Sequence, residues 1–242
     1  MSDTPPPSVS APNPRVYGPR GLMRYRRLII GLSSRHAWKI DNDRLARMYA
    51  SHVSANHLEV GPADGHFLSQ APDPVDASGG PVPAERRRIQ LMDLNPGPLR
   101  MCEPKLAGRA RVTSHVHDVL SAPWPVADAS VDSVAMFHVL HCVPGNGIRA
   151  KATAFSEAAR VLSPEQGVFF GATLPGAADG HTSNNWLARR LQHAYNQPER
   201  NIFHNRGDRV TDLRAVLEEH FTDVEVTVMG ADALWVARGP RA

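Results

Sequence analysis

A glycine-containing turn and a later aspartate have the types and spacing that suit a nucleotide ligand. Residues 57–67, His-Leu-Glu-Val-Gly-Pro-Ala-Asp-Gly-His-Phe, run from an aliphatic strand into a turn that holds Gly61 and Gly65. A glycine has no Cβ atom and therefore lets the backbone come close to a ligand. A second aliphatic segment, residues 89–94, carries Asp93 near its end, where a carboxylate can bind the two hydroxyls of a ribose. These features predict a nucleotide-binding strand and turn.

Two histidines further along the chain are the candidate catalytic groups. His138 and His141 follow the hydrophobic strand predicted at residues 131–137. A neutral imidazole can take a proton from a phenol, an enol or a protonated amine near pH 7. We predict one of the two as a base, with His141 slightly favoured, and the alternative for either is packing against the nucleotide or capping the next helix. No pair of histidines with a carboxylate has metal-site spacing, so no metal is expected.

The order of the motifs resembles that of class I S-adenosylmethionine-dependent methyltransferases of the small-molecule, bacterial type. The segment Glu59-x-Gly61-x-Ala63-x-Gly65 is similar to the family's Glu/Asp-x-Gly-x-Gly-x-Gly turn, with alanine in place of the middle glycine. The Gly-x-Gly-x-x-Gly fingerprint of dinucleotide-binding folds is absent. Residues 159–167, Ala-Arg-Val-Leu-Ser-Pro-Glu-Gln-Gly, resemble the family's Ala-Arg-Val-Leu-x-Pro-x-Gly passage with one extra residue. The resemblance covers about residues 55–175.

The resemblance implies an α/β fold with a doubly wound, seven-stranded, mostly parallel sheet, the Rossmann-like methyltransferase fold, and with N-terminal helices over the cofactor site. It implies S-adenosyl-L-methionine as cofactor and S-adenosyl-L-homocysteine as product. In relatives the acidic residue at the position of Asp118 contacts the adenine, and the fourth strand ends where the methyl group and the acceptor meet. The cofactor-binding residues carried over are Glu59, Gly61, Ala63, Gly65, Asp93, Leu94, Asp118, Val119 and His138.

The acceptor is predicted to be a small organic molecule, methylated on oxygen or nitrogen and plausible as a natural product of secondary metabolism. Methylation of carbon or sulfur remains an alternative, as does a non-catalytic cofactor-binding or regulatory protein, which Ala63 and the uncertain base both suggest. An Asn/Asp-Pro-Pro-Tyr motif is absent and no RNA-binding module is evident, so no nucleic-acid substrate is expected. The candidate wall residues of the acceptor pocket are Tyr25, Trp38, Trp186, Tyr195 and Phe203.

The elements that must position these residues follow from periodicity and turn chemistry. Residues 1–20 hold six prolines and are predicted to be a flexible tail. Residues 21–242 are expected to form one domain, with a helical cap at 21–54 and the core at 55–242. Later helices are expected at 149–162, 181–196 and 212–220, and strands at 167–173, 223–229 and 233–237. Predicted helix caps are residues 41–43, Ser183 or Asn184, and Thr211, and residues 71–86 are predicted to be a mobile surface loop.

Composition places few further limits on the protein. Of 242 residues, 42% are hydrophobic and 21% charged, which is ordinary for a globular protein, and no apolar run approaches the roughly 18–20 residues that span a bilayer. The N-terminal residues do not resemble a secretory signal, so a cytoplasmic location is expected, without a membrane partner. The two cysteines predict no disulfide framework. The protein is expected to be a monomer or a homodimer.

Overall fold

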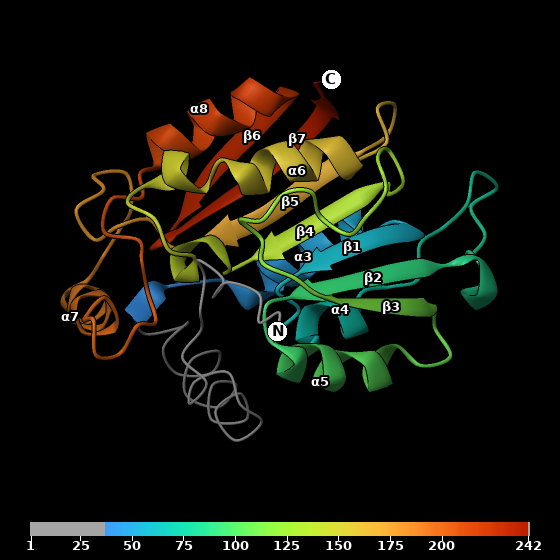
Figure 1. Ribbon diagram of the computed structural model, residues 1–242, viewed down its shortest axis with the longest axis horizontal. Coiled ribbons are helices and arrows are strands. Elements are labelled where there is room, and N and C mark those ends of the chain that lie inside the picture. The colour runs from blue at the N-terminus through green and yellow to red at the C-terminus, as the bar shows by residue number, and fades with distance from the viewer. Residues whose placement is uncertain (1–36, 242) are drawn as a thin grey trace, which may run out of the picture.

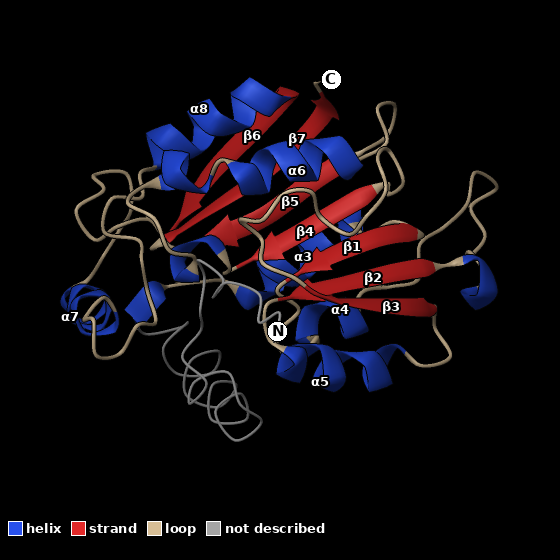
Figure 2. Ribbon diagram, in the orientation of Figure 1, coloured by secondary structure: helices blue, strands red, loops and turns tan. Residues whose placement is uncertain are grey.

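The computed structural model describes residues 37–241, which contain one seven-stranded sheet with helices on both faces (Figures 1 and 2). The strand order is β3-β2-β1-β4-β5-β7-β6, and β7 alone runs antiparallel to its neighbours. The predicted fold class is therefore confirmed. The predicted tail, most of the helical cap and Tyr25 lie outside the described residues. The strands are β1 Asn56–Val60, β2 Arg88–Asp93, β3 Arg111–Val116, β4 Ser133–Phe137, β5 Val168–Thr173, β6 Phe221–Met229 and β7 Asp232–Pro240.

Alternation along the central strands produces two hydrophobic cores, one on each face of the sheet. In β4, Val134 and Met136 face one core, whereas Ala135 and Phe137 face the other. Helices α6 Thr153–Val161 and α8 Val210–His220 cover the first face. The second face is covered by α3 Asn42–His52, α4 His66–Gln70 and α5 Pro96–Leu106, whereas α7 Trp186–Tyr195 packs on the same core from beyond the ends of the strands. Strands buried on both sides read as continuous hydrophobic runs, which is why their positions were predictable.

The residues at which helices begin were predicted less well than the presence of the helices. The cap at residues 41–43 is confirmed, because the Asp41 side chain accepts a hydrogen bond from the backbone of Asp43. The predicted Ser183 or Asn184 cap is wrong: α7 begins after Asn185, whose Oδ1 accepts from the amide of Ala188 at 2.8 Å.

The predicted Thr211 cap of α8 is also wrong, since the helix begins at Val210, two residues before the predicted start, and its N-cap is Arg209. The amide of Val210 donates to Oδ1 of Asp179 at 3.2 Å, so the carboxylate comes from a segment distant in sequence. The helix predicted at 149–162 is divided into a 3₁₀ turn, Ile148–Lys151, and α6. Local patterns do not reveal a cap that tertiary structure supplies.

The segment at 71–86 is a surface loop, as predicted, and its mobility stays a prediction. The carboxylate of Asp73 accepts hydrogen bonds from Arg87 and from Arg109, which tie the start of the loop to the sheet and to the end of α5. Within residues 37–241, none of the helices combines the length and apolarity needed to cross a bilayer.

Candidate active site

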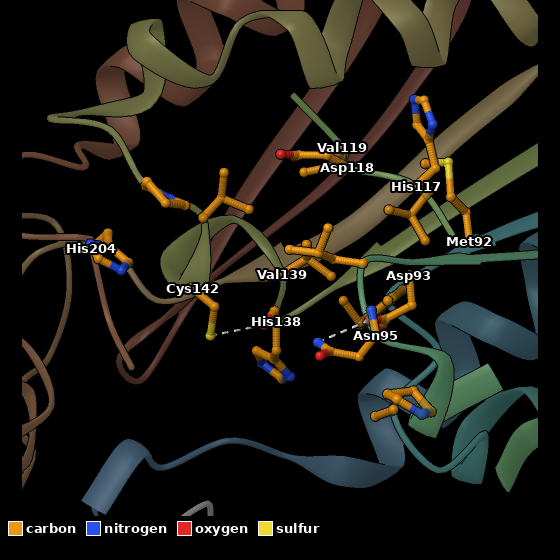
Figure 3. Close-up of a pocket in the computed structure, with 18 of the residues that line it drawn as sticks. Met92, Asp93, Asn95, His117, Asp118, Val119, His138, Val139, Cys142 and His204 are labelled. Carbon is orange, nitrogen blue, oxygen red and sulfur yellow. Dashed lines mark hydrogen bonds between the residues drawn. The ribbon is translucent and has the colours of Figure 1, made fainter. Parts of the chain in front are cut away.

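A pocket lies at the carboxyl ends of β1, β2 and β4, where parallel sheets commonly bind ligands. It encloses about 990 Å³ of empty space, including the solvent at its mouth. In the view of Figure 3, His138 and Cys142 lie between Asp93 on one side and His204 on the other. The predicted cofactor residues on its wall are Gly61, Ala63, Asp93, Leu94, Asp118, Val119 and His138. Glu59 and Gly65 do not line it.

The turn after β1 is left-handed at three positions. Gly61, Ala63 and Gly65 have φ angles of 68°, 50° and 70°. A Cβ atom on Gly61 would lie 2.3 Å from Cγ2 of Val139, and one on Gly65 would lie 2.5 Å from Sγ of Cys102. Ala63, where the family has glycine, therefore adopts the backbone conformation that a glycine would adopt, at a strain of about 1–2 kcal/mol. The alanine departs from the motif in sequence but not in backbone shape.

Glu59 lies beneath this turn in a buried network. Its carboxylate accepts a hydrogen bond from the hydroxyl of Tyr49 at 2.6 Å and lies 3.0 Å from Nε2 of His57. His57 Nδ1 in turn lies 2.8 Å from Oγ of Ser133, so the network joins α3, β1 and β4. Burial, together with the Glu59 carboxylate, holds the pKa of Tyr49 well above its ordinary value, so the phenol keeps the proton that it donates. The geometry gives Glu59 a positioning role under the turn, and contact with a cofactor stays a prediction.

Asp93 ends β2 on the pocket wall. Its Oδ1 accepts a hydrogen bond from the backbone of Asn95 at 2.7 Å. Burial raises the pKa of Asp93 to about 6, although hydrogen bonds from Asn95 act in the opposite direction. The carboxylate is thus ionised at neutral pH, and its second oxygen remains available to a ligand hydroxyl.

The two candidate bases lie in different surroundings. His138 follows β4 with a left-handed φ of 57°, lines the pocket, and has Nε2 3.0 Å from Oδ2 of Asp232. His141 is buried and does not line the pocket. Its Nδ1 accepts from the amide of Leu174 at 3.3 Å, and its ring packs against Phe203 at 4.6 Å between centroids. The geometry favours His138 over His141, the reverse of the predicted order.

Protonation separates the two histidines further. Burial lowers the pKa of His138, but the Asp232 carboxylate more than offsets this, and the pKa lies above 6.5. Burial, with His138 and Lys151 as positively charged neighbours, places the pKa of His141 well below 6.5. His141 is therefore a neutral packing group at neutral pH, whereas the Asp232 carboxylate favours the protonated form of His138.

The predicted acceptor-wall aromatics gather elsewhere. Trp38 and Tyr195 contact Phe203, with ring centroids 6.2 and 5.1 Å apart, and this cluster packs behind His141. None of the three lines the pocket, and Trp186 has 74% of its surface exposed. Their proposed contact with an acceptor therefore has no support in the pocket geometry.

Other residues form the wall beyond His138. Cys142 lines the pocket together with Val143 and Pro144, which follow β4, and with Asn201 and His204. The last two come from the connector between α7 and α8, where no local signal identifies them.

His117 also lies on the pocket wall, with its Nε2 2.7 Å from the carbonyl of Ser121. His115, two residues earlier, instead contacts Oε1 of Gln90 at 2.9 Å. His117, on the pocket wall, lies just beyond the end of β3, whereas His115 lies within that strand.

A buried ion pair fixes this wall. Nζ of Lys151 donates to the carbonyls of Leu140 and His204, at 2.8 and 3.1 Å, and to the carboxylate of Asp208 at 2.7 Å. Both charged side chains are fully buried. The pair therefore holds the turn after β4 against the connector that carries His204. Across residues 37–241, no three His, Cys, Asp or Glu side chains group as metal ligands would.

Comparison with known proteins identifies the family. The family described as "Methyltransferase domain" matches residues 58–170, which run from within β1 to within β5. Demethylluteothin O-methyltransferase of Streptomyces thioluteus is 35% identical over 206 residues, which cover 83% of this chain and 80% of that protein. The chain belongs to the class I S-adenosylmethionine-dependent methyltransferases.

Further relatives agree with this assignment. The physcion biosynthesis cluster O-methyltransferase of Aspergillus chevalieri is 30% identical to this methyltransferase, over 93% of this chain and 94% of that one. The structure of the N-methyltransferase NodS from Bradyrhizobium japonicum WM9, in complex with S-adenosyl-L-homocysteine, is 16% identical and has a TM-score of 0.57 over 92% of this chain and 98% of that one. The second similarity shows that the fold is shared.

Proposed function

We propose that this methyltransferase transfers a methyl group to an oxygen atom of a small organic acceptor of the natural-product type. The observation that carries the proposal is the position of His138, on the pocket wall between the nucleotide side and the wall of Cys142 and His204. A hydroxyl must lose its proton to become a strong nucleophile, and an imidazole is suited to accept it near pH 7. Two of the relatives, those of Streptomyces thioluteus and Aspergillus chevalieri, are named O-methyltransferases, which supports oxygen as the acceptor atom.

The residues on one side of the pocket fit S-adenosylmethionine. Gly61 lies on the pocket wall, and because the place of a Cβ atom is taken by the side chain of Val139, only glycine lets the turn come this close to the segment after β4. The Asp93 carboxylate suits the ribose hydroxyls, and Asp118 lies further along the same wall. When bound, the cofactor supplies an electrophilic methyl group on a positively charged sulfur.

The opposite side suits an apolar acceptor with one acidic hydroxyl. Val143 and Pro144 offer hydrocarbon surface, while His138, Asn201 and His204 are the polar groups there. Such a mixture of apolar wall and few polar groups is typical of small-molecule sites. The chain's contribution to the reaction is to orient the hydroxyl, exclude water and receive the proton on His138.

Calorimetry and product analysis test the proposal. S-adenosylmethionine and S-adenosylhomocysteine are titrated into the protein with NAD as control, and micromolar binding of the first two is expected. Acceptors with phenol, enol, amine, thiol and activated carbon groups are then offered with cofactor that carries a deuterated methyl group. Deuterated methyl on oxygen supports the proposal, whereas methyl on nitrogen, carbon or sulfur contradicts it. Cofactor binding without turnover on any acceptor would favour a non-catalytic cofactor-binding protein.

Asp93→Ala is expected to weaken binding of S-adenosylhomocysteine by about 1–3 kcal/mol, because the ribose hydroxyls lose a charged hydrogen-bond partner. The affinity of the unsubstituted protein should also fall as the pH is lowered through about 6, where Asp93 takes up a proton, and the variant should lack this component. Calorimetry between pH 5 and pH 8 measures both effects. Asp76→Ala, in the exposed loop, is the control and should behave as the unsubstituted protein. Unchanged affinity of the Asp93 variant would place the ribose elsewhere.

A further inference from the structure

We propose that Asp232 is a positioning residue for methyl transfer, which holds the His138 ring with the proton on Nε2 and so leaves Nδ1 to accept the proton of the acceptor. The inference rests on the proposed role of His138 as base. Asp232 has no motif around it in the sequence, where residues 230–232 predict only a turn between two strands.

The sheet brings the two residues together from 94 positions apart in the sequence. Strand β5 lies between β4 and β7, with Ala172 paired to Phe137 on one side and Thr173 paired to Ala233 on the other. His138 and Asp232 are the next residues beyond these two pairs, so both side chains lie at the same end of β5. The contact between them is thus set by strand register, which is a rigid part of the fold.

The hydrogen bonding of Asp232 is unusual for a buried carboxylate. The side chain is fully buried, and its Oδ2 lies 3.0 Å from Nε2 of His138. Within the described part of the chain, Oδ1 has no hydrogen-bond partner. Asp208, which is equally buried, accepts from Lys151 on both oxygens, at 3.0 and 2.7 Å. A carboxylate that serves stability alone is expected to resemble Asp208, because burying a charge with one partner is unfavourable.

The chemistry of the pair determines which nitrogen of His138 can act. An ionised carboxylate only accepts hydrogen bonds, so Nε2 must carry the hydrogen, and the neutral ring then has its lone pair on Nδ1. In the proposed step the proton leaves the acceptor oxygen for Nδ1, and the electron pair of the O–H bond stays on that oxygen. The ring becomes a cation, which the Asp232 carboxylate stabilises, as in other carboxylate–histidine pairs.

The other ionisable groups near His138 do not supply the negative charge that stabilises its protonated ring. His141, whose ring centroid is 5.8 Å away, and Cys142 come from the turn Leu140–Cys142, and His204 lies on the same pocket wall. His141 has a pKa well below 6.5 and is neutral at neutral pH. Burial lowers the pKa of His138 and Asp232 raises it above the ordinary value, so removal of the carboxylate charge should lower it.

Asp232→Asn tests the inference, since it removes the charge and keeps the shape. We expect a fall in kcat of about 100-fold or more with little change in KM or in the Kd of S-adenosylhomocysteine. The acid limb of the kcat profile should move to lower pH. The melting temperature should stay the same or rise, because a poorly solvated buried charge is lost. Asp223→Asn, on the exposed side of the same hairpin, is the matched control and should retain full activity.

Nitrogen-15 NMR of the histidine rings, recorded without acceptor, separates this inference from the proposed function. The unsubstituted protein should show His138 protonated on Nε2, and the variant should show a lower pKa and a shift toward the Nδ1-protonated ring. A ring protonated on Nδ1 in the unsubstituted protein overturns the inference, even if Asp232→Asn does not fold. The inference is also overturned if Asp232→Asn leaves the tautomer and the pKa of His138 unchanged. If the NMR shifts are found but His138 variants keep full activity, the base assignment fails and the Asp232 contact is structural.

Discussion

Gly61→Ala is expected to weaken binding of S-adenosylhomocysteine by at least about 100-fold, which corresponds to about 2.7 kcal/mol. The new Cβ atom would lie 2.3 Å from Cγ2 of Val139. Because valine is β-branched, the Val139 side chain has little freedom to turn away. The turn must therefore shift at the position where the cofactor is expected to meet the backbone. Calorimetry gives the loss of affinity, and circular dichroism gives the change in melting temperature.

Gly108→Ala is the matched control for this substitution. Gly108 has a φ of 76°, also left-handed, but a Cβ atom there meets nothing within 4 Å. This variant should lose about 1 kcal/mol of stability through backbone strain and should bind the cofactor normally. Combining Gly61→Ala with Val139→Ala should recover part of the affinity, since it removes the clashing methyl group. Normal binding by Gly61→Ala alone would mean that the cofactor does not depend on this turn.

His138→Gln is expected to lower kcat by about 100- to 10,000-fold, the usual contribution of a positioned base. Glutamine retains polar atoms but accepts no proton at neutral pH, so the Kd of S-adenosylhomocysteine should change little. In the unsubstituted protein, kcat should fall as the pH is lowered through a value above 6.5, because His138 must be neutral to act and Asp232 raises its pKa. Initial rates of product formation between pH 5.5 and pH 9 measure both effects.

His115→Gln provides the comparison for this prediction. His115 contacts Gln90 on β2 and lies outside the pocket, so its substitution should leave kcat unchanged. Equal activity of His138→Gln and the unsubstituted protein would show that positioning alone drives the transfer to this acceptor.

Much of the cofactor side of the pocket could be predicted from the sequence. Gly61, Asp93 and Asp118 follow strands whose hydrophobic patterns are local, and parallel strands bring their carboxyl ends to one edge. The order of motifs along the chain, which resembles that of the family, also predicted the seven-stranded, mostly parallel sheet.

The opposite side could not be predicted in the same way. His204 reaches the pocket through the buried Lys151 pair, and Asp232 reaches His138 through strand register, and no short segment encodes either contact. His138 and His141 are three residues apart, and only the left-handed backbone at His138 separates a pocket residue from a core residue. Prediction of aromatic wall residues failed for a similar reason, because their packing around Phe203 depends on contacts distant in sequence.

The Lys151 ammonium makes the acceptor wall a single cooperative unit. It bonds the carbonyls of Leu140 and His204 at once, and the amide of His204 also donates to the carbonyl of His141 at 2.7 Å. If the Leu140 segment and the His204 segment separate, the Lys151 ammonium is either exposed to solvent or left buried with fewer hydrogen-bond partners. Hydrogen exchange at the two segments should therefore report one shared opening free energy rather than two independent ones.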